Sequence, residues 1–376
     1  MTSSLRICLV GPLPVPAGGM ANQTAQLRGL LEAEGHRVDM VRSNAPYRPH
    51  WLHRVPYARA AARLLPYLCQ LWRAAGRAQL MHVMANSGWS WYLFAAPAIW
   101  IGHLRGCPVV VNYRGGEAAG FLQTSLRRVA PTLRRARLLI VPSGFLATVF
   151  ARHGFEYVIV PNVVDLERFG AAASAPQQNE RQPSRAPAVL VARHLEPIYD
   201  IGTALRAFAL LRATHPLASM LVAGSGPEHA RLLQLAERLG IAAGVRFCGL
   251  LEHAAMAQCY QAADIVLNPS LADNMPNSML EALASGVPVV STNVGGVPYL
   301  VEDGRHALLV PPGQPEAMAR AMRRVLEEHG LAEKMHVAGL QLVHQYAWSQ
   351  VYPRLLVAYQ LALAPQRPPL AKRRRA

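Results

Sequence analysis

Two acidic residues eight positions apart, Asp273 and Glu281, bracket the part of the chain best suited to chemistry. The apolar run before them predicts a strand, and the polar stretch up to Pro276 predicts a loop. Asn277 or Ser278 then suits the N-cap of a helix. The first backbone N–H groups of a helix have no partner inside it. A strand, a loop and a helix N-terminus together therefore predict an anion-binding site.

The two acids admit two interpretations. Glu281 is expected in the first turn of this helix, on the side of the loop, where its carboxylate can accept hydrogen bonds from ribose hydroxyls. Alternatively, Glu281 only complements the helix dipole and Asp273 is a solvated loop residue. The two residues taken alone do not decide between these readings.

Alternating strand and helix patterns must position this segment. The first part of the chain predicts a βαβ unit, with a strand at 5–10, a glycine-bearing loop at 11–19, a helix at 20–34 and a strand at 37–41. Apolar runs at 109–111, 138–141 and 158–160 suit buried parallel strands. After the polar stretch 171–188 the alternation restarts, with strands predicted at 188–192, 220–223, 245–247, 265–267 and 287–291 and helices at 201–212, 228–239, 254–262 and 278–284. The pattern predicts an α/β protein with parallel, doubly wound sheets, and 376 residues suit two domains.

The segment from Asp273 to Glu281 resembles the E-x7-E signature of retaining glycosyltransferases, particularly glycosyltransferase family 4. The resemblance continues in order over residues 140–345, through Pro161 to Asp165 with Phe169, Gly224 to Glu228, Leu283 to Val290, Gly295-Gly296 and Asp303-Gly304. It implies the GT-B fold, in which two Rossmann-like domains face an interdomain cleft. The predicted boundaries are a first, acceptor-side domain at 1–168, a linker at 169–187, a donor domain at 188–345, a helix at 346–363 that packs back on the first domain, and a basic, disordered tail at 364–376.

The resemblance also implies a site for a nucleotide-diphosphate sugar donor. The helix near Ser278 would receive the diphosphate on its N-terminal amides, Glu281 would hold the ribose, and Arg193 would stabilise the leaving diphosphate. Asp273 would contact the donor sugar. The remaining implied donor-binding residues are Gly18, Gly19, Gly224, Gly226, Leu250, Asn274, Met275, Pro276 and Asn277. Each of these glycines alone is equally typical of an ordinary tight turn.

Several departures from the family pattern bear on catalysis. Asp273 is one methylene shorter than the usual Glu, Pro276 has no N–H, and the lysine expected shortly after Arg193 is absent. Our hypothesis is that Arg114, in the Arg114-Gly115 segment, supplies the missing positive charge. His82 lies at the end of another predicted first-domain strand and either lines the acceptor side or is a hydrogen-bonded core or rim histidine.

Metal and cofactor motifs are missing from the sequence. There is no D-x-D pair and no His/Cys cluster with metal-ligand spacing. We therefore predict metal-independent transfer that uses no cofactor, the nucleotide-diphosphate sugar being a substrate. Retention of configuration is implied by the resemblance, in which the leaving phosphate takes the acceptor proton.

The net charge of +16 is concentrated in the first half. Residues 1–168 hold 19 Arg and 7 acids, a net of +12, whereas 169–376 hold 19 basic and 15 acidic residues, a net of +4. The segment 51–80 interleaves arginines with aromatic and leucine residues and contains no acid. It predicts contact with an anionic membrane surface or, alternatively, a Rossmann helix pair with a solvated basic face. A nucleic-acid partner is disfavoured because the second half is nearly neutral and carries no recognisable binding motif.

Five scattered cysteines without a CxxC pair indicate a reducing cytosol. The first apolar run is only strand-length, so no signal peptide is predicted. The charge-free stretch 89–104 is predicted to be a buried helix, with a membrane span as the minor alternative. We expect a cytoplasmic protein, peripheral at the inner face of the membrane if its basic segment binds lipid.

Together these features predict a glycosyltransferase that acts on a glycan or lipid-linked acceptor in bacterial surface polysaccharide synthesis. The alternatives are a catalytically degenerate GT-B scaffold and a sugar-nucleotide epimerase or phosphorylase. A phosphorylase would want a lysine near the site, which this chain lacks.

Overall fold

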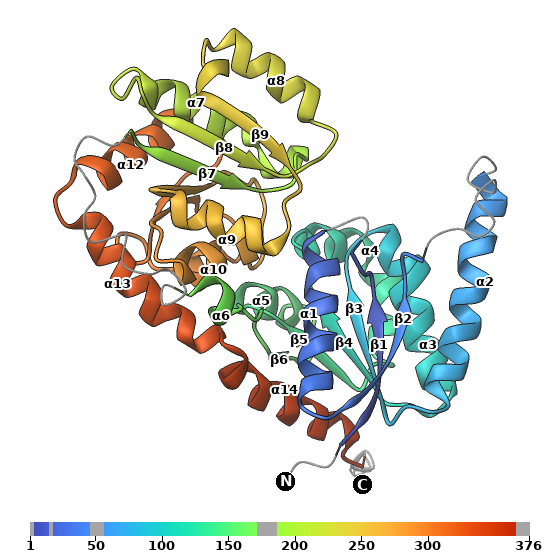
Figure 1. The fold of residues 1–376 in the computed structure, drawn as a ribbon. Coiled ribbons are helices and arrows are strands. Elements are labelled where there is room, and N and C mark those ends of the chain that lie inside the picture. The colour runs from blue at the N-terminus through green and yellow to red at the C-terminus, as the bar shows by residue number, and fades with distance from the viewer. Residues whose placement is uncertain (1–3, 15–17, 46–55, 171–185, 366–376) are drawn as a thin grey trace, which may run out of the picture.

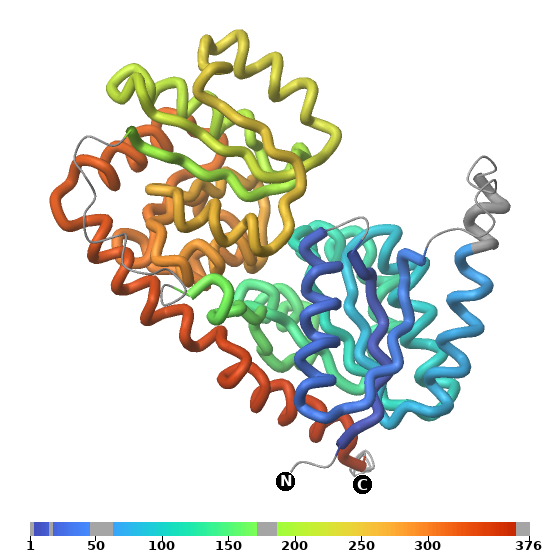
Figure 2. The backbone as a smooth tube through the Cα atoms, viewed as in Figure 1, coloured from blue at the N-terminus to red at the C-terminus, as the bar shows by residue number. Residues whose placement is uncertain are grey.

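The computed structural model describes residues 4–14, 18–45, 56–170 and 186–365. The chain forms two α/β bodies, each with one parallel sheet between helices, and a long C-terminal helix runs from the second body back along the first (Figures 1 and 2). Most of the predicted linker at 169–187 and tail at 364–376 lies outside the described residues.

The first sheet has six parallel strands in the order β2-β1-β3-β4-β5-β6. They are β1 (Arg6–Gly11), β2 (Arg37–Arg42), β3 (Leu80–Ala85), β4 (Val109–Tyr113), β5 (Leu138–Val141) and β6 (Val158–Ile159). One face is covered by α2 (Pro56–Ala75), the π-helical turn η2 (Trp91–Ala95), α3 (Ala96–Leu104), α4 (Ala118–Leu133) and α5 (Gly144–Ala151). The other face is covered by α1 (Gly19–Ala33) and α14 (Trp348–Leu363).

The second sheet is also six-stranded and parallel, in the order β12-β11-β10-β7-β8-β9. Its strands are β7 (Ala188–Ala192), β8 (Ser219–Ala223), β9 (Val245–Gly249), β10 (Ile265–Asn268), β11 (Val289–Thr292) and β12 (Ala307–Val310). One face packs on α7 (Ile201–Arg212), α8 (His229–Arg238) and α12 (Pro315–Glu327), and the other on α6 (Leu166–Phe169), α9 (His253–Ala262), α10 (Asn277–Ala284) and α11 (Val297–Leu300). Single turns η4 (Pro197–Tyr199) and η5 (Ala242–Gly244) connect elements, and α13 (Leu331–Val343) with η6 (His344–Tyr346) leads into α14.

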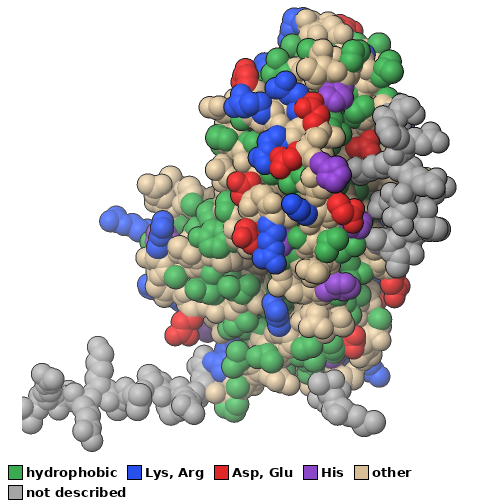
Figure 3. Space-filling model, turned by 90° about the vertical axis from the view of Figure 1, so that its left-hand side faces the viewer, with side chains coloured by type: hydrophobic (Ala, Val, Ile, Leu, Met, Phe, Trp, Pro, Cys, Tyr) green, Lys and Arg blue, Asp and Glu red, His purple; other side chains and the backbone are tan. Residues whose placement is uncertain are grey.

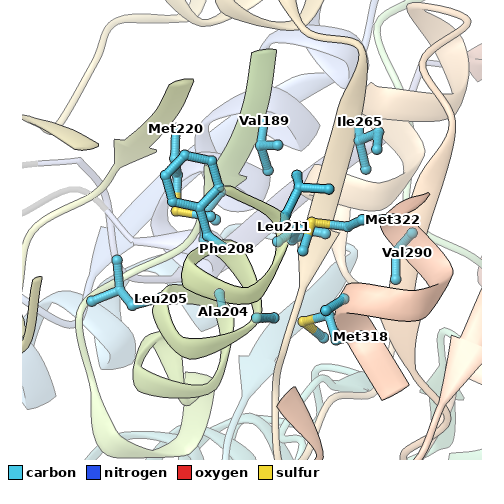
Figure 4. Packing of buried hydrophobic residues seen from close by; sticks show 14 of the residues in the cluster. Val189, Ala204, Leu205, Phe208, Leu211, Met220, Ile265, Val290, Met318 and Met322 are labelled. Atoms are coloured by element: carbon cyan, nitrogen blue, oxygen red, sulfur yellow. The ribbon is translucent and has the colours of Figure 1, made fainter. Parts of the chain in front are cut away.

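The core of the second domain shows why apolar runs become central strands here. Phe208 and Leu211 of α7 pack with Met318 and Met322 of α12 over the β7 residue Val189 (Figure 4). All five side chains are buried. Complete burial of one such side chain contributes about 1.5–3 kcal/mol, so helices on both faces favour continuous apolar strands.

Each sheet has a topological switch point, a pair of neighbouring strands from which the chain continues in opposite directions across the sheet. In the first sheet it lies between β1 and β3, and in the second between β7 and β10. Ligands of parallel α/β sheets bind outside the carboxyl ends of the strands at such points. The loops after these four strands are therefore the expected positions for functional residues.

The predicted α/β class with two parallel sheets is confirmed, and helix α7 has the predicted bounds. The prediction of a buried helix at 89–104 is wrong in part. The stretch is helical, and Trp91 and Ile99 are buried, but Trp100 is 36% and Leu104 66% exposed. The physical reason is that α3 lies in the outer layer, so only one of its sides packs inward. No helix within the described ranges is long and apolar enough to cross a membrane.

Charged residues are distributed differently in the two halves of the chain. On the face that Figure 3 shows, acidic and basic side chains lie interspersed over its upper part. By contrast, residues 56–137 of the first domain contain eleven Arg and a single acid, Glu117. Glu117 lies at the start of α4, at the rim of the cleft described below.

Candidate donor site in the interdomain cleft

A cleft of about 1230 Å³ lies between the two domains. It is lined by loops that follow β1, β3 and β4 of the first sheet and β7, β8, β9 and β10 of the second. Of the sixteen residues predicted for the site, all but Gly115 and His82 line it. The topology therefore brings together segments that lie far apart in the sequence.

Arg193 directly follows β7 at the switch point of the second sheet. Its Nε and Nη2 donate to Asn268 Oδ1 over 3.0 and 2.8 Å, and Nη2 also pairs with the carboxylate of Asp273. The side chains of Arg193 and Asp273 are only 11% and 12% exposed. Its Nη1 has no hydrogen-bond partner among the described residues, and Arg193 lines the cleft.

Asn268, which the sequence analysis did not single out, holds Arg193 in place. It ends β10 and is 2% exposed. Its Nδ2 donates to Ser291 Oγ over 3.0 Å, and its Oδ1 accepts from Ser270 Oγ over 2.7 Å. Because the amide is fixed on both sides, it orients the guanidinium. A polar residue at the carboxyl end of a buried strand was the signal that could have revealed it.

The loop from Asp273 to Pro276 is fixed by the glycine pair that follows β11. The Gly296 N–H donates to the Asp273 carbonyl over 2.9 Å. A Cβ at Gly296 would lie 1.7 Å from the Asn274 carbonyl oxygen, which explains why glycine is needed. Across the cleft, Ser143 Oγ donates to Asn274 Oδ1, so the first domain also contacts this loop.

Helix α10 begins at Asn277, one residue earlier than predicted, and its cap also differs from the prediction. The N-cap is Pro276, and no side chain caps the first turn. Asn277 Oδ1 instead accepts from Gln23 Nε2 over 2.8 Å and from Asn162 Nδ2 over 2.7 Å. Asn277 therefore joins the domains rather than capping its own helix. Without a side-chain cap, the amides of Asn277 and Ser278 remain available to an anion, whereas the Met279 amide donates to the Pro276 carbonyl over 3.2 Å.

Glu281 lies in the second turn of α10, not in the first as predicted, because the helix already begins at Asn277. Its Oε2 accepts a hydrogen bond of 2.9 Å from the Tyr260 hydroxyl. Burial raises the pKa of the Glu281 carboxyl, while the Tyr260 hydrogen bond and the charge of Arg193 oppose this rise. Tyr260, on α9, was not predicted, since nothing in its local sequence marks it as a partner of an acid.

The glycines of the β8 loop permit close backbone packing beside Arg193. A Cβ at Gly224 would lie 1.8 Å from the Arg193 carbonyl oxygen, and one at Gly226 would lie 2.4 Å from the Leu195 carbonyl oxygen. Leu250, just after β9, is 49% exposed and lines the cleft. The opposite wall has Gly18 and Gly19 at the start of α1, where an added Cβ would meet nothing within 4 Å.

Arg114 forms the centre of a polar network on the first domain. Its Nε donates to Asn112 Oδ1 over 3.0 Å, and its Nη1 donates to Gln23 Oε1 over 2.8 Å and to Asn162 Oδ1. Burial lowers the pKa of Arg114 to about 10, which still leaves it charged at neutral pH. Gln23 and Asn162 are also the partners of Asn277, so the network links Arg114 to the start of α10.

His82 and Gly115 do not line the cleft. His82 is completely buried in β3, and its Nδ1 lies 2.8 Å from the Tyr359 hydroxyl of α14. Burial, reinforced by the charge of Arg114, lowers the pKa of His82 to about 3, so the imidazole is neutral. The acceptor-side interpretation of His82 is therefore wrong, and the core alternative holds. Gly115 is buried against Asn86 and Ser87.

The described residues contain no group of three or more His, Cys, Asp or Glu side chains arranged to hold a metal ion. The arrangement instead offers fixed positive charge from Arg193 and an uncapped helix N-terminus, with a carboxylate at Glu281. Such groups suit a ligand that combines phosphates with hydroxyls. Two facing Rossmann-like domains with this site define the architecture of a GT-B glycosyltransferase.

Comparison with known proteins agrees. The family model described as "Glycosyltransferase Family 4" matches residues 17–168, and that described as "Glycosyl transferases group 1" matches residues 186–328. The chain belongs to this family of GT-B glycosyltransferases.

Individual relatives resemble the chain in sequence, and solved structures resemble it in fold. The chain is 27% identical over 292 residues to a glycogen synthase of Mycobacterium tuberculosis, covering 74% of this chain and 69% of that protein. It is 25% identical to a phosphatidyl-myo-inositol mannosyltransferase of Mycolicibacterium smegmatis, covering 95% and 94%. Among solved structures, Anabaena HepE in complex with UDP-glucose superposes with a TM-score of 0.71 at 18% identity, covering 95% of this chain and 98% of that chain.

Proposed function

We propose that this glycosyltransferase moves a sugar, with retention and without a metal ion, from a nucleotide-diphosphate sugar to a glycan or lipid-linked acceptor. The observation that supports this most directly is the position of Arg193. It lies at the switch point of the second sheet and lines the same cleft as the uncapped start of α10. The solved complex of the structurally similar HepE contains UDP-glucose, which supports a donor of this class.

In the proposed reaction the bond between the sugar C1 and the diphosphate oxygen breaks, and charge develops on the diphosphate. Fixed donors that face this charge stabilise the transition state more than the ground state. Arg193 Nη1 and the first amides of α10 would do so, and Glu281 would accept hydrogen bonds from the ribose. The acceptor oxygen bonds to C1 on the face that the leaving group vacates, and its proton passes to the leaving phosphate oxygen.

The pairing of Asp273 with Arg193 suggests how the shortened acid acts. In the present structure its carboxylate is bonded to the guanidinium and to the backbone N–H of Asn274. We propose that Asp273 orients Arg193. Its carboxylate oxygens would also accept hydrogen bonds from the donor sugar when a donor is bound. Arg114 would add positive potential through the network at Asn162 and Gln23, taking over part of the role of the absent lysine.

We place the reaction in bacterial surface polysaccharide synthesis at the inner face of the cell membrane. In the first domain, Arg105 stacks over the Trp72 ring at 4.8 Å, and Arg135 stacks over Trp100 at 3.8 Å. Both tryptophans are partly exposed. Arginine and tryptophan together suit the charged interface of an anionic bilayer. Sedimentation with phosphatidylglycerol vesicles at low salt tests this, and a lack of binding at every ionic strength would contradict it.

A screen of nucleotide-diphosphate sugars tests the central proposal. The protein should gain thermal stability with at least one of them and hydrolyse it slowly without an acceptor. Glu281→Ala should abolish the stabilisation. Stabilisation by none would overturn the proposed function, whereas stabilisation without any turnover would favour the catalytically degenerate scaffold.

A further inference from the structure

Three aromatic side chains form a row beside the cleft on the first domain: Trp89, Tyr92 and Phe121, here called the aromatic row. The rings of Trp89 and Tyr92 are 6.4 Å apart, and those of Tyr92 and Phe121 are 6.0 Å apart, both edge to face. Trp89 is 78% exposed, the highest value for any tryptophan in the described part of the chain. An exposed indole supported by a second ring is a ready contact surface.

The row lies at the switch point of the first sheet. Trp89 is the first helical residue after β3, directly following the turn at Gly88, which has a φ of +67°. Its neighbours Asn86 and Ser90 line the cleft. Phe121 is one helical turn beyond Glu117, another residue of the cleft wall. The aromatic row therefore adjoins residues of the cleft wall along the chain, while its own three side chains lie outside the cleft lining.

The backbone beneath the aromatic row is held firmly. Ser87 Oγ lies 2.7 Å from the Tyr113 hydroxyl. A Cβ at Gly115 would lie 2.5 Å from Asn86 Oδ1, so the β4 loop packs directly on this segment. The chain then enters the π-helical turn η2, a rare form often found at functional sites. The exposure of Trp89 thus occurs on a fixed support, which favours a binding role.

We propose that the aromatic row binds a pyranose ring of a glycan acceptor. This inference rests on the proposed function and names the acceptor class. The C–H bonds on one face of a pyranose are apolar and slightly positive, and they match the negative face of an indole. Its hydroxyls need polar partners at the edge, which the Glu117 carboxylate and the Asn86 amide can supply.

The alternative occupant, an anionic lipid surface, fits the row less well. Lipid headgroups would be matched by arginines, and within the described residues the arginines that stack on tryptophan do so at Trp72 and Trp100. The acid of this region, Glu117, lies instead one helical turn from Phe121. Charge complementarity therefore favours a neutral, hydroxyl-rich ligand at the aromatic row.

The test compares Trp89→Ala with the matched variant Trp72→Ala, since both remove a partly exposed tryptophan from the first domain. Full-length proteins are applied to an array of oligosaccharides of glucose, galactose, mannose and N-acetylglucosamine, and separately to phosphatidylglycerol vesicles. We expect Trp89→Ala to weaken glycan binding by about tenfold or more, as for a central aromatic contact, with Trp89→Phe restoring part of it. Trp72→Ala should leave glycan binding unchanged.

Three results would overturn the inference. The first is a wild-type protein that binds no glycan while a sugar nucleotide still stabilises it, which would leave the proposed donor function standing. The second is a Trp89→Ala variant that binds glycans like the wild type although its melting temperature is unchanged. The third is a Trp89→Ala variant that loses vesicle binding but keeps glycan binding, which would assign the aromatic row to lipid.

Discussion

The two switch points of the molecule face each other across one cleft, yet they are built from different residues. That of the second sheet carries paired charges: Arg193 and Asp273 are about nine-tenths buried, and Asn268 holds Arg193. That of the first sheet carries open glycines, amides and the exposed Trp89. Fixed, desolvated charges suit a ligand of constant chemistry such as a diphosphate. Exposed aromatic and amide groups suit a ligand that varies.

The largest expected effect concerns the charged side of this comparison. Arg193→Ala should lower kcat for transfer by about 10²- to 10³-fold, the range for loss of one preorganised charge-stabilising donor. Arg114→Ala should cost less, because its guanidinium acts through Asn162 and Gln23. Steady-state kinetics with the donor found in the screen measures both. Equal losses would place Arg114 directly at the leaving group.

Glu281 provides a pH-dependent test of the same side. Loss of its charge in Glu281→Gln should weaken donor binding by about 10- to 100-fold at neutral pH, the value of a charge-assisted hydrogen bond. Because burial raises the pKa of Glu281, the wild type should lose donor affinity on acidification at a higher pH than an ordinary glutamate would. Calorimetric titration between about pH 5 and 8 should show that donor affinity depends on pH in the wild type and does not in the variant.

The same raised pKa fixes the sign of the effect on stability. Below the pKa that Glu281 has in the unfolded chain, the residue is protonated in both the folded and the unfolded state. Its ionisation then does not change the free energy of unfolding. As pH rises through the raised folded pKa, ionisation favours the unfolded chain. Glu281→Gln should therefore unfold at a higher temperature than the wild type at neutral pH, with the difference vanishing in acid. A lower melting temperature at neutral pH would contradict this.

Asn268 tests whether orientation of the charge matters as much as its presence. Asn268→Ala should lower kcat by about tenfold, since two donors of Arg193 and the Ser270 hydroxyl lose their acceptor. A merely structural role would lower stability while leaving kcat of the folded fraction intact. Asn268→Asp, which keeps the acceptor oxygen, should recover part of kcat with an unchanged KM for the donor.

The smallest effect is expected where the two sides meet. Asn277→Ala removes the acceptor shared by Gln23 and Asn162, so the domains should close less firmly over the donor. Donor affinity should fall about threefold for each neutral hydrogen bond lost. Small-angle scattering with and without donor reports the closure. Gln23→Ala is the matched change on the other domain. If only Asn277→Ala lowers donor affinity, Asn277 contacts the donor rather than holding the domains together.

Local patterns in the sequence predicted the elements well, because continuous apolar runs and helical periodicity encode burial directly. The pairing across the cleft was not predictable. The contact between Asn277 and Gln23 joins residues 254 positions apart, and Asn277 also satisfies the local rule for an N-cap. For His82 the sequence left the acceptor side and the core both open, because its partner Tyr359 comes from the last helix. Long-range partners of polar residues leave no periodic signal.

Helix α14 has a consequence for engineering this enzyme. Val351, Leu355 and Tyr359 are buried in the core that β1 and α1 form, although they belong to the end of the chain. A fragment that stops at residue 170 would expose this core face, so the first domain should not fold as an isolated unit. Hybrids that exchange acceptor domains between enzymes of this family must therefore transplant two separate stretches of sequence, with 348–363 accompanying the first 170 residues.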